Sequence, residues 1–85
     1  MVITVKVWIL LMPQFSRGYA DSTGFYLTGI FNEELSREEA LLAAYLYLEE
    51  ENITQRASVG FYKNGPEPLY PGSTESRCHF WVRYL

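Results

Sequence analysis

One short segment of the chain, Ser36 and the residues that follow it, limits the possible folds more than any other. Ser36 is followed three residues later by Glu39 and then by an apolar run, which is the sequence signature of a capping box at the start of a helix. The pattern predicts a helix over residues 37–51. At 100° per residue, the stripe that should lie on a sheet consists of Leu41, Ala44, Tyr45 and Leu48.

The other apolar segments have a two-residue period, which is typical of strands because alternate side chains point to opposite faces of a sheet. Four strands are predicted, over residues 2–12, 25–31, 57–63 and 78–85. Residues 14–24 are rich in glycine, serine and threonine and are expected to form a long exposed loop. The proline-rich residues 67–76 are expected to form a loop or an irregular edge, and Gly29 is expected to mark a bulge.

These elements predict an α+β fold of order ββαββ, in which a four-stranded, mostly antiparallel sheet carries one helix packed on one face. The 85 residues have room for one core and are expected to form a single domain, residues 1–85. The chain contains 7 Tyr, 5 Phe and 2 Trp, and its net charge is only −3. This composition predicts a folded chain rather than a disordered one.

One helix can cover only one face of the predicted sheet, so the other face should meet solvent, a second subunit or a ligand. The alternation places aromatic and basic residues on this uncovered face, namely Lys6, Trp8, Leu10, Tyr26, Tyr62, Arg77, His79, Trp81 and Arg83. Trp and Arg are enriched at binding hot spots. The face therefore predicts either a protein-binding surface or a homodimer contact, and the alternative is a scatter of exposed aromatic residues. The expected hot spot consists of Trp8, Tyr62, Trp81 and Arg83.

Binding of single-stranded nucleic acid is the second prediction for this face. Aromatic side chains interleaved with arginine on a sheet can stack bases and contact phosphates. However, the aromatic-glycine strand signature of the RNA-recognition fold is missing, and one helix is expected where that fold has two. The net charge of −3 also disfavours a broad phosphate contact, so nucleic acid ranks below a protein partner.

Two features of the predicted helix have open interpretations. Its C-terminal end, where the helix dipole disfavours negative charge, carries Glu49, Glu50 and Glu51. These residues are interpreted either as a solubilising end or as a secondary acidic patch for a basic partner. The apolar face of the helix is also broad, because it includes Leu42, Leu46 and Tyr47. This breadth indicates either the covering of a curved sheet or a contact with a partner or second copy.

Catalytic, metal and cofactor sites are not predicted. Cys78 and His79 are neighbours in a predicted strand, so their side chains point to opposite faces and cannot pair as nucleophile and base. These two groups cannot complete a zinc site. The glycine-containing loops lack the Gly-Lys-Ser/Thr ending of a phosphate-binding loop. We expect a protein that is not an enzyme and needs no cofactor.

The cysteine count and the N-terminal apolar run predict the compartment. A single cysteine excludes an intrachain disulfide, which fits a reducing compartment such as the cytoplasm. Residues 2–12 are interrupted by Thr4 and Lys6 and are too short to span a bilayer. No association with a membrane is therefore expected.

The order of the elements, the helix start Ser36-Arg37-Glu38-Glu39-Ala40 and the single covering helix resemble small phage-encoded proteins, including anti-CRISPR proteins with one helix and an antiparallel sheet. The resemblance is one of layout and size and carries over no functional residue. It implies a non-enzymatic inhibitor or adaptor in the host cytoplasm that docks on a host defence complex such as CRISPR-Cas. The glutamate clusters are compatible with that role, whereas the aromatic and arginine face departs from simple DNA mimicry.

Overall fold

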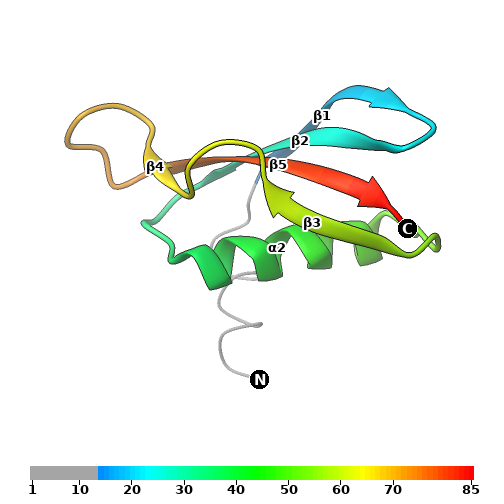
Figure 1. The fold of residues 1–85 in the computed structure, drawn as a ribbon. Helices are drawn as coiled ribbons and strands as arrows, with labels where there is room; N and C mark the ends of the chain where they lie inside the picture. The colour runs from blue at the N-terminus through cyan, green and yellow to red at the C-terminus, as the bar shows by residue number, and fades with distance from the viewer. Residues whose placement is uncertain (1–13) are drawn as a thin grey trace.

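The computed structural model describes residues 14–85, which form one helix packed on an antiparallel sheet (Figure 1). The elements in chain order are β1 (Gln14–Asp21), β2 (Gly24–Phe31), α2 (Arg37–Glu50), β3 (Ala57–Phe61), β4 (Glu67–Pro68) and β5 (Ser76–Tyr84). The predicted α+β class, with one helix on one face of the sheet, is confirmed. The strand predicted over residues 2–12 lies outside the described residues.

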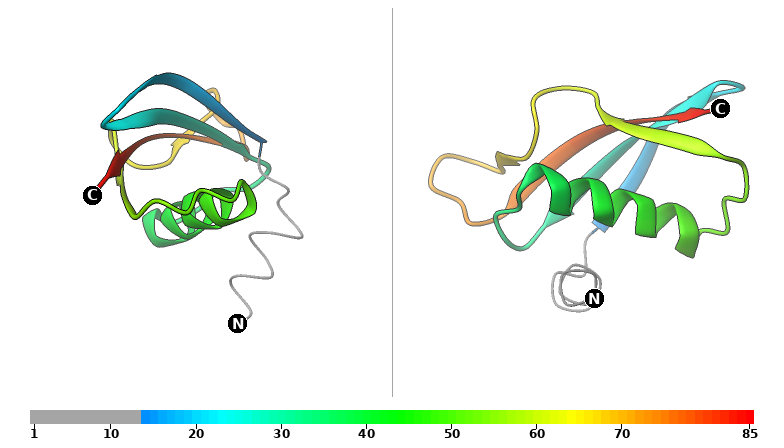
Figure 2. Two further views of the ribbon diagram at one scale, coloured as in Figure 1. Left: turned by 90° about the vertical axis from the view of Figure 1, so that its right-hand side faces the viewer. Right: turned by 60° about the horizontal axis from the view of Figure 1, so that its bottom comes forward.

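The strand order in the sheet is β1-β2-β5-β3, and every pairing is antiparallel. The short β4 pairs with the first residues of β5, where Glu67 lies opposite Arg77. The predicted irregular edge in the proline-rich segment is therefore present as β4. Figure 2 shows the strands layered on one side of the molecule and α2 on the other. Among the described strands, β5 makes the most pairings, because it is hydrogen-bonded to β2, β3 and β4.

The long loop predicted over residues 14–24 is wrong, because most of this segment is the strand β1 and the remainder is a tight turn into β2. The Asp21 carboxylate closes the turn by accepting hydrogen bonds from the Thr23 backbone N–H at 2.8 Å and from the Thr23 hydroxyl at 2.6 Å. The register of β1 shifts between Arg17 and Ala20, which is a bulge in the edge strand. The glycine, serine and threonine content of residues 14–24 therefore belongs to a solvent-exposed strand and the short turn that follows it.

The bulge expected at Gly29 is also absent, since Gly29 pairs in regular register with Phe15 on one side and with Cys78 on the other. Its lack of a side chain has a different cause. A Cβ atom at this position would lie 2.8 Å from the Phe15 ring and 3.1 Å from the Phe31 ring. Gly29 therefore provides the space in which the Phe15 ring crosses β2 and reaches the core.

The helix begins as predicted. The Glu39 backbone N–H donates to Ser36 Oγ at 3.2 Å, and the Ser36 backbone N–H donates to Glu39 Oε1 at 3.1 Å, which completes the capping box. At the other end, Asn52 adopts a left-handed conformation with φ of 57°. The Ile53 N–H bonds the Leu48 carbonyl at 3.0 Å, so the helix ends in a Schellman-type turn.

The predicted buried stripe of the helix is only partly correct. The helix residues that are buried against the sheet are Ala40, Ala43, Ala44 and Leu48. Leu41 packs at the border of the core, and Tyr45 is 43% exposed. Alanines allow the helix to approach the sheet closely, and Tyr45 instead lies beside β3, where its hydroxyl accepts a hydrogen bond from the Val59 N–H at 3.1 Å.

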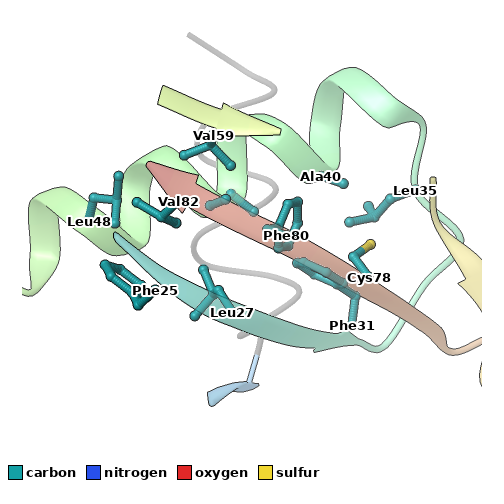
Figure 3. Packing of buried hydrophobic residues seen from close by; sticks show 12 residues of the cluster. Phe25, Leu27, Phe31, Leu35, Ala40, Leu48, Val59, Cys78, Phe80 and Val82 are labelled. Carbon is teal, nitrogen blue, oxygen red and sulfur yellow. The ribbon is translucent and has the colours of Figure 1, made fainter. Parts of the chain in front are cut away.

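The core lies between α2 and the inner face of the sheet (Figure 3). Alternate residues of β2 and β5 face it, and they lie opposite one another as the pairs Phe25–Val82, Leu27–Phe80 and Gly29–Cys78. Phe25, Leu27, Phe80, Val82 and Cys78 are all at most 2% exposed. The predicted alternation of the last strand is therefore confirmed, and it fixes which side chains occupy the opposite face.

Candidate functional site

The candidate site is the sheet surface opposite α2, here called the outer face, and it consists of Tyr19, Tyr26, Tyr62, Arg77, His79, Trp81 and Arg83. The buried residues Cys78, Phe80 and Val82 alternate along β5 with residues that are half-buried or exposed. Trp81 lies opposite Tyr26, and His79 lies opposite Thr28. The structure thus places the predicted residues of β2, β5 and the end of β3 on one surface, while Trp8, Lys6 and Leu10 lie outside the described residues.

Tyr26, His79 and Glu67 form a connected group at the centre of the outer face. The Tyr26 hydroxyl lies 2.7 Å from His79 Nδ1, and their rings are nearly parallel with centroids 5.9 Å apart. Glu67 Oε1 lies 3.6 Å from His79 Nε2 on the other side of the ring. A proton on Nε2 satisfies both contacts, because Tyr26 then donates to Nδ1 and Nε2–H points at the carboxylate.

The surroundings of His79 keep its imidazole uncharged at neutral pH. Burial lowers the pKa of His79, the charges of Lys63 and Arg77 lower it further, and the Glu67 carboxylate partly opposes them. His79 therefore acts here as a neutral hydrogen-bonding group. It holds the Tyr26 ring, which meets the Tyr62 ring edge-on at a centroid distance of 4.9 Å.

A second aromatic pair lies on the same face and includes a residue that the sequence interpretation missed. The Tyr19 and Trp81 rings are within 20° of parallel, with centroids 6.5 Å apart. Tyr19 lies in the segment predicted as a loop, and its neighbours Gly18 and Ala20 provide no apolar alternation that would indicate a strand. Tyr19 is 68% exposed and Tyr62 59%, so each leaves most of its surface to solvent.

The basic side chains of the outer face are grouped with these rings. Arg83 lies opposite Gly24 and Ser58 at one end, and Arg77 lies opposite Glu67 at the other. Lys63 is close enough to influence the charge of His79. The face therefore combines aromatic surface with positive charge, and its acidic member, Glu67, is directed at His79.

The opposite layer of the molecule is acidic. Residues 33–51 contain seven glutamates and one arginine, Arg37. Of the predicted acidic patch, Glu49 and Glu50 are exposed, whereas Glu51 forms an ion pair with Arg17 of β1 at 3.0 Å. Most acidic residues of the described chain thus lie in or beside the helix, whereas Arg77 and Arg83 lie on the outer face.

The apolar helix residues for which a partner contact was considered are partly used within the fold. The Tyr47 ring lies 4.8 Å from the Phe15 ring, and its hydroxyl accepts a hydrogen bond from Arg17 Nε at 2.8 Å. Leu42 and Leu46 are half-buried. Part of the broad apolar helix face, namely Tyr47, therefore packs against Phe15 and Arg17 of β1 and covers the core there.

The chemistry available elsewhere in the described residues is limited. Burial raises the pKa of the Cys78 thiol to about 12, and the side chain is fully enclosed on the face opposite His79. Within residues 14–85 no group of three or more His, Cys, Asp or Glu side chains could hold a metal ion.

In the same part of the chain no helix is long and apolar enough to cross a membrane. No protein-family model, curated protein or solved structure matches this sequence.

Proposed function

We propose that this chain is a non-enzymatic binding protein, an inhibitor or adaptor that docks on a protein partner through the outer face. The observation that supports this proposal is the arrangement of aromatic rings on that face. Tyr26, His79 and Tyr62 are held by mutual contacts, and Trp81 is paired with Tyr19. Rings that are ordered before binding lose little conformational entropy when a partner docks, which favours affinity.

The charges favour a protein over a polyanion as the partner. Arg77, Arg83 and Lys63 can pair with isolated carboxylates on a protein surface. A nucleic acid carries dense charge along its whole length. It would also approach Glu67 on this face and Asp21 at the β1–β2 turn, both of which are exposed acids. The resemblance to phage-encoded inhibitors suggests a host defence complex such as CRISPR-Cas as the first class of partner to test.

The test is capture of a partner by the tagged protein, with Trp81→Ala as the variant and Tyr70→Ala as the matched control. Tyr70 is 59% exposed, lies in the segment between β4 and β5, and is not one of the residues that define the outer face. We expect Trp81→Ala to weaken capture by about 30-fold or more, as truncation of a hot-spot residue does. Tyr70→Ala should bind as the wild type does. Equal capture by both variants, with unchanged thermal unfolding, would overturn the proposal.

Single-stranded nucleic acid remains a second candidate because Arg77 and Arg83 share the outer face with the aromatic pairs, and Lys63 is close enough to His79 to influence its charge. Its signature is an affinity for an oligothymidylate that falls steeply as salt is added. A homodimer through the outer face is the third outcome, and it would appear as a molecular mass in solution that rises with concentration. Either result in place of protein capture would replace the first proposal.

A further inference from the structure

The strand β3 is an edge of the sheet, on the side opposite β1. The strand order leaves one side of β3 without a neighbouring strand among residues 14–85. Tyr62 continues the register of β3, and its N–H bonds the His79 carbonyl of β5 at 2.8 Å, so the even-numbered residues of β3 point their backbone groups at β5. The outward-pointing N–H and C=O groups, here called the β3 edge, belong to Ala57, Val59 and Phe61.

The sequence of β3 carries none of the common protections of an edge strand. Proteins protect exposed edges with charged residues, proline or a bulge, because unpaired N–H and C=O groups are a template for pairing with another chain. The opposite edge, β1, has both the charged Arg17 and a bulge between Arg17 and Ala20. By contrast, β3 has the uncharged sequence ASVGF and pairs with β5 in unbroken register. Protection of the β3 edge must therefore come from a residue outside the strand.

Tyr45 of α2 is such a residue. The helix runs beside β3 (Figure 1), and the Tyr45 hydroxyl accepts a hydrogen bond from the Val59 N–H at 3.1 Å. Val59 is the middle residue of β3, so this bond occupies the central donor of the β3 edge. Tyr45 is 43% exposed, so the contact is made at the surface, where another strand would approach.

We propose that the Tyr45 hydroxyl blocks the β3 edge against pairing with β3 of a second copy of this chain. An antiparallel pair centred on Val59 places each Val59 opposite its equivalent and Ala57 opposite Phe61, so the strand is complementary to itself. In such a pair, each Val59 N–H donates to the carbonyl of the facing Val59. Both N–H groups are already bonded to Tyr45 hydroxyls, so pairing has to break two hydrogen bonds. This inference is independent of the proposed function, because it concerns the β3 edge and not the outer face.

The Tyr45→Phe substitution tests the inference, because it removes the hydroxyl and keeps the ring. Tyr70→Phe is the matched control, since it makes the same change in the segment between β4 and β5. Sedimentation equilibrium up to millimolar concentration measures self-association. We expect Tyr45→Phe to associate about tenfold or more tightly than the wild type, because two N–H groups per dimer become free to pair. Tyr45→Phe that is as monomeric as Tyr70→Phe would overturn the inference.

A second substitution, Ala57→Pro in the Tyr45→Phe background, shows whether association uses the β3 edge. Proline removes the outward N–H of residue 57 and leaves the hydrogen bonds with β5 in place, so the double variant should return to the monomer. Association that survives Ala57→Pro, or that Trp81→Ala abolishes instead, would place the contact elsewhere and overturn the inference.

Hydrogen exchange at the Val59 amide provides a readout in the monomer. The N–H that Tyr45 protects in the wild type should exchange faster in Tyr45→Phe at low protein concentration, whereas Tyr70→Phe should exchange as the wild type does. An unchanged exchange rate in Tyr45→Phe would show that the hydroxyl does not occupy this donor and would overturn the inference.

Discussion

The Tyr26 hydroxyl and His79 Nδ1 are 2.7 Å apart across the β2–β5 pairing, which ties the ring at the centre of the outer face to a titratable group. Protonation of His79 would turn Nδ1 into a donor, so Tyr26 could no longer donate to it. The direction of this hydrogen bond therefore reverses on protonation, because the Tyr26 hydroxyl can accept from a protonated Nδ1. Its consequences can be measured without knowledge of the partner.

We predict that stability falls as the pH drops from about 6.5, the ordinary pKa of histidine, through the lower pKa of His79 in the folded chain. In this window the unfolded chain binds the proton more readily than the folded chain, so acid favours unfolding. Above it the contribution is fully present. NMR titration of the His79 ring and urea unfolding at several pH values measure the effect. Glu67→Gln should lower the pKa of His79 further and Lys63→Gln should raise it, and opposite shifts would contradict the assignment.

The two strand glycines should respond in opposite ways to the same substitution. Gly29→Ala places a methyl group 2.8 Å from the Phe15 ring and should destabilise the fold by about 1–3 kcal/mol. Gly60→Ala meets no atom and should be neutral or stabilising by about 0.5 kcal/mol. Urea unfolding of the pair measures both, and equal effects would show that crowding by Phe15 is not the reason for Gly29.

The capping box makes a contribution that one substitution can isolate. Ser36→Ala removes the acceptor for the Glu39 N–H and should lower the free energy of unfolding by about 1 kcal/mol. Ser36→Asp supplies another acceptor and should retain most of the stability. Ser58→Ala, at an exposed strand position, serves as the control. A cost for Ser36→Ala no larger than that of the control would show that the helix start does not limit stability.

Arg17 should matter more through packing than through its ion pair. The Arg17 and Glu51 side chains are 41% and 44% exposed, so Glu51→Gln should cost less than about 1 kcal/mol. Arg17→Ala also removes the hydrogen bond to Tyr47 and the contacts with the Phe25 and Tyr47 rings, at 5.1 and 5.6 Å. Its cost should reach about 1–2 kcal/mol. Urea unfolding at low and high salt distinguishes the two, because only the Glu51 contribution should be screened.

The elements with strong periodic patterns could be predicted from the sequence. The apolar alternation in residues 25–31 and 78–85 predicted the inner and outer faces of β2 and β5, and the pair of Ser36 and Glu39 predicted the helix start. Four of the outer-face residues follow directly from the phase of β5: Arg77, His79, Trp81 and Arg83. These predictions succeeded because burial on one side imposes the pattern on the sequence.

The parts that could not be predicted depend on tertiary contacts. β1 has mostly exposed side chains and carries Gly18, so its sequence lacks the apolar alternation of a strand. It is held by pairing with β2, by the Phe15 ring in the space above Gly29 and by Arg17 on Tyr47. Tyr19 was missed for the same reason. The position of Tyr45 likewise follows from the close approach of the alanines of α2 to the sheet, which periodicity alone does not reveal.

Because the Cys78 thiol is buried in β5, its reaction with an added reagent can report how often the native sheet opens. A thiol reagent attacks the thiolate, and burial holds the pKa of this group at about 12, so labelling requires the strand to leave the core. Because β5 pairs with β2, β3 and β4, removing β5 from the core breaks the hydrogen bonds of all three pairings. The rate at which an added disulfide reagent modifies the native protein therefore measures how often the whole sheet separates, on a chain that needs no engineered label.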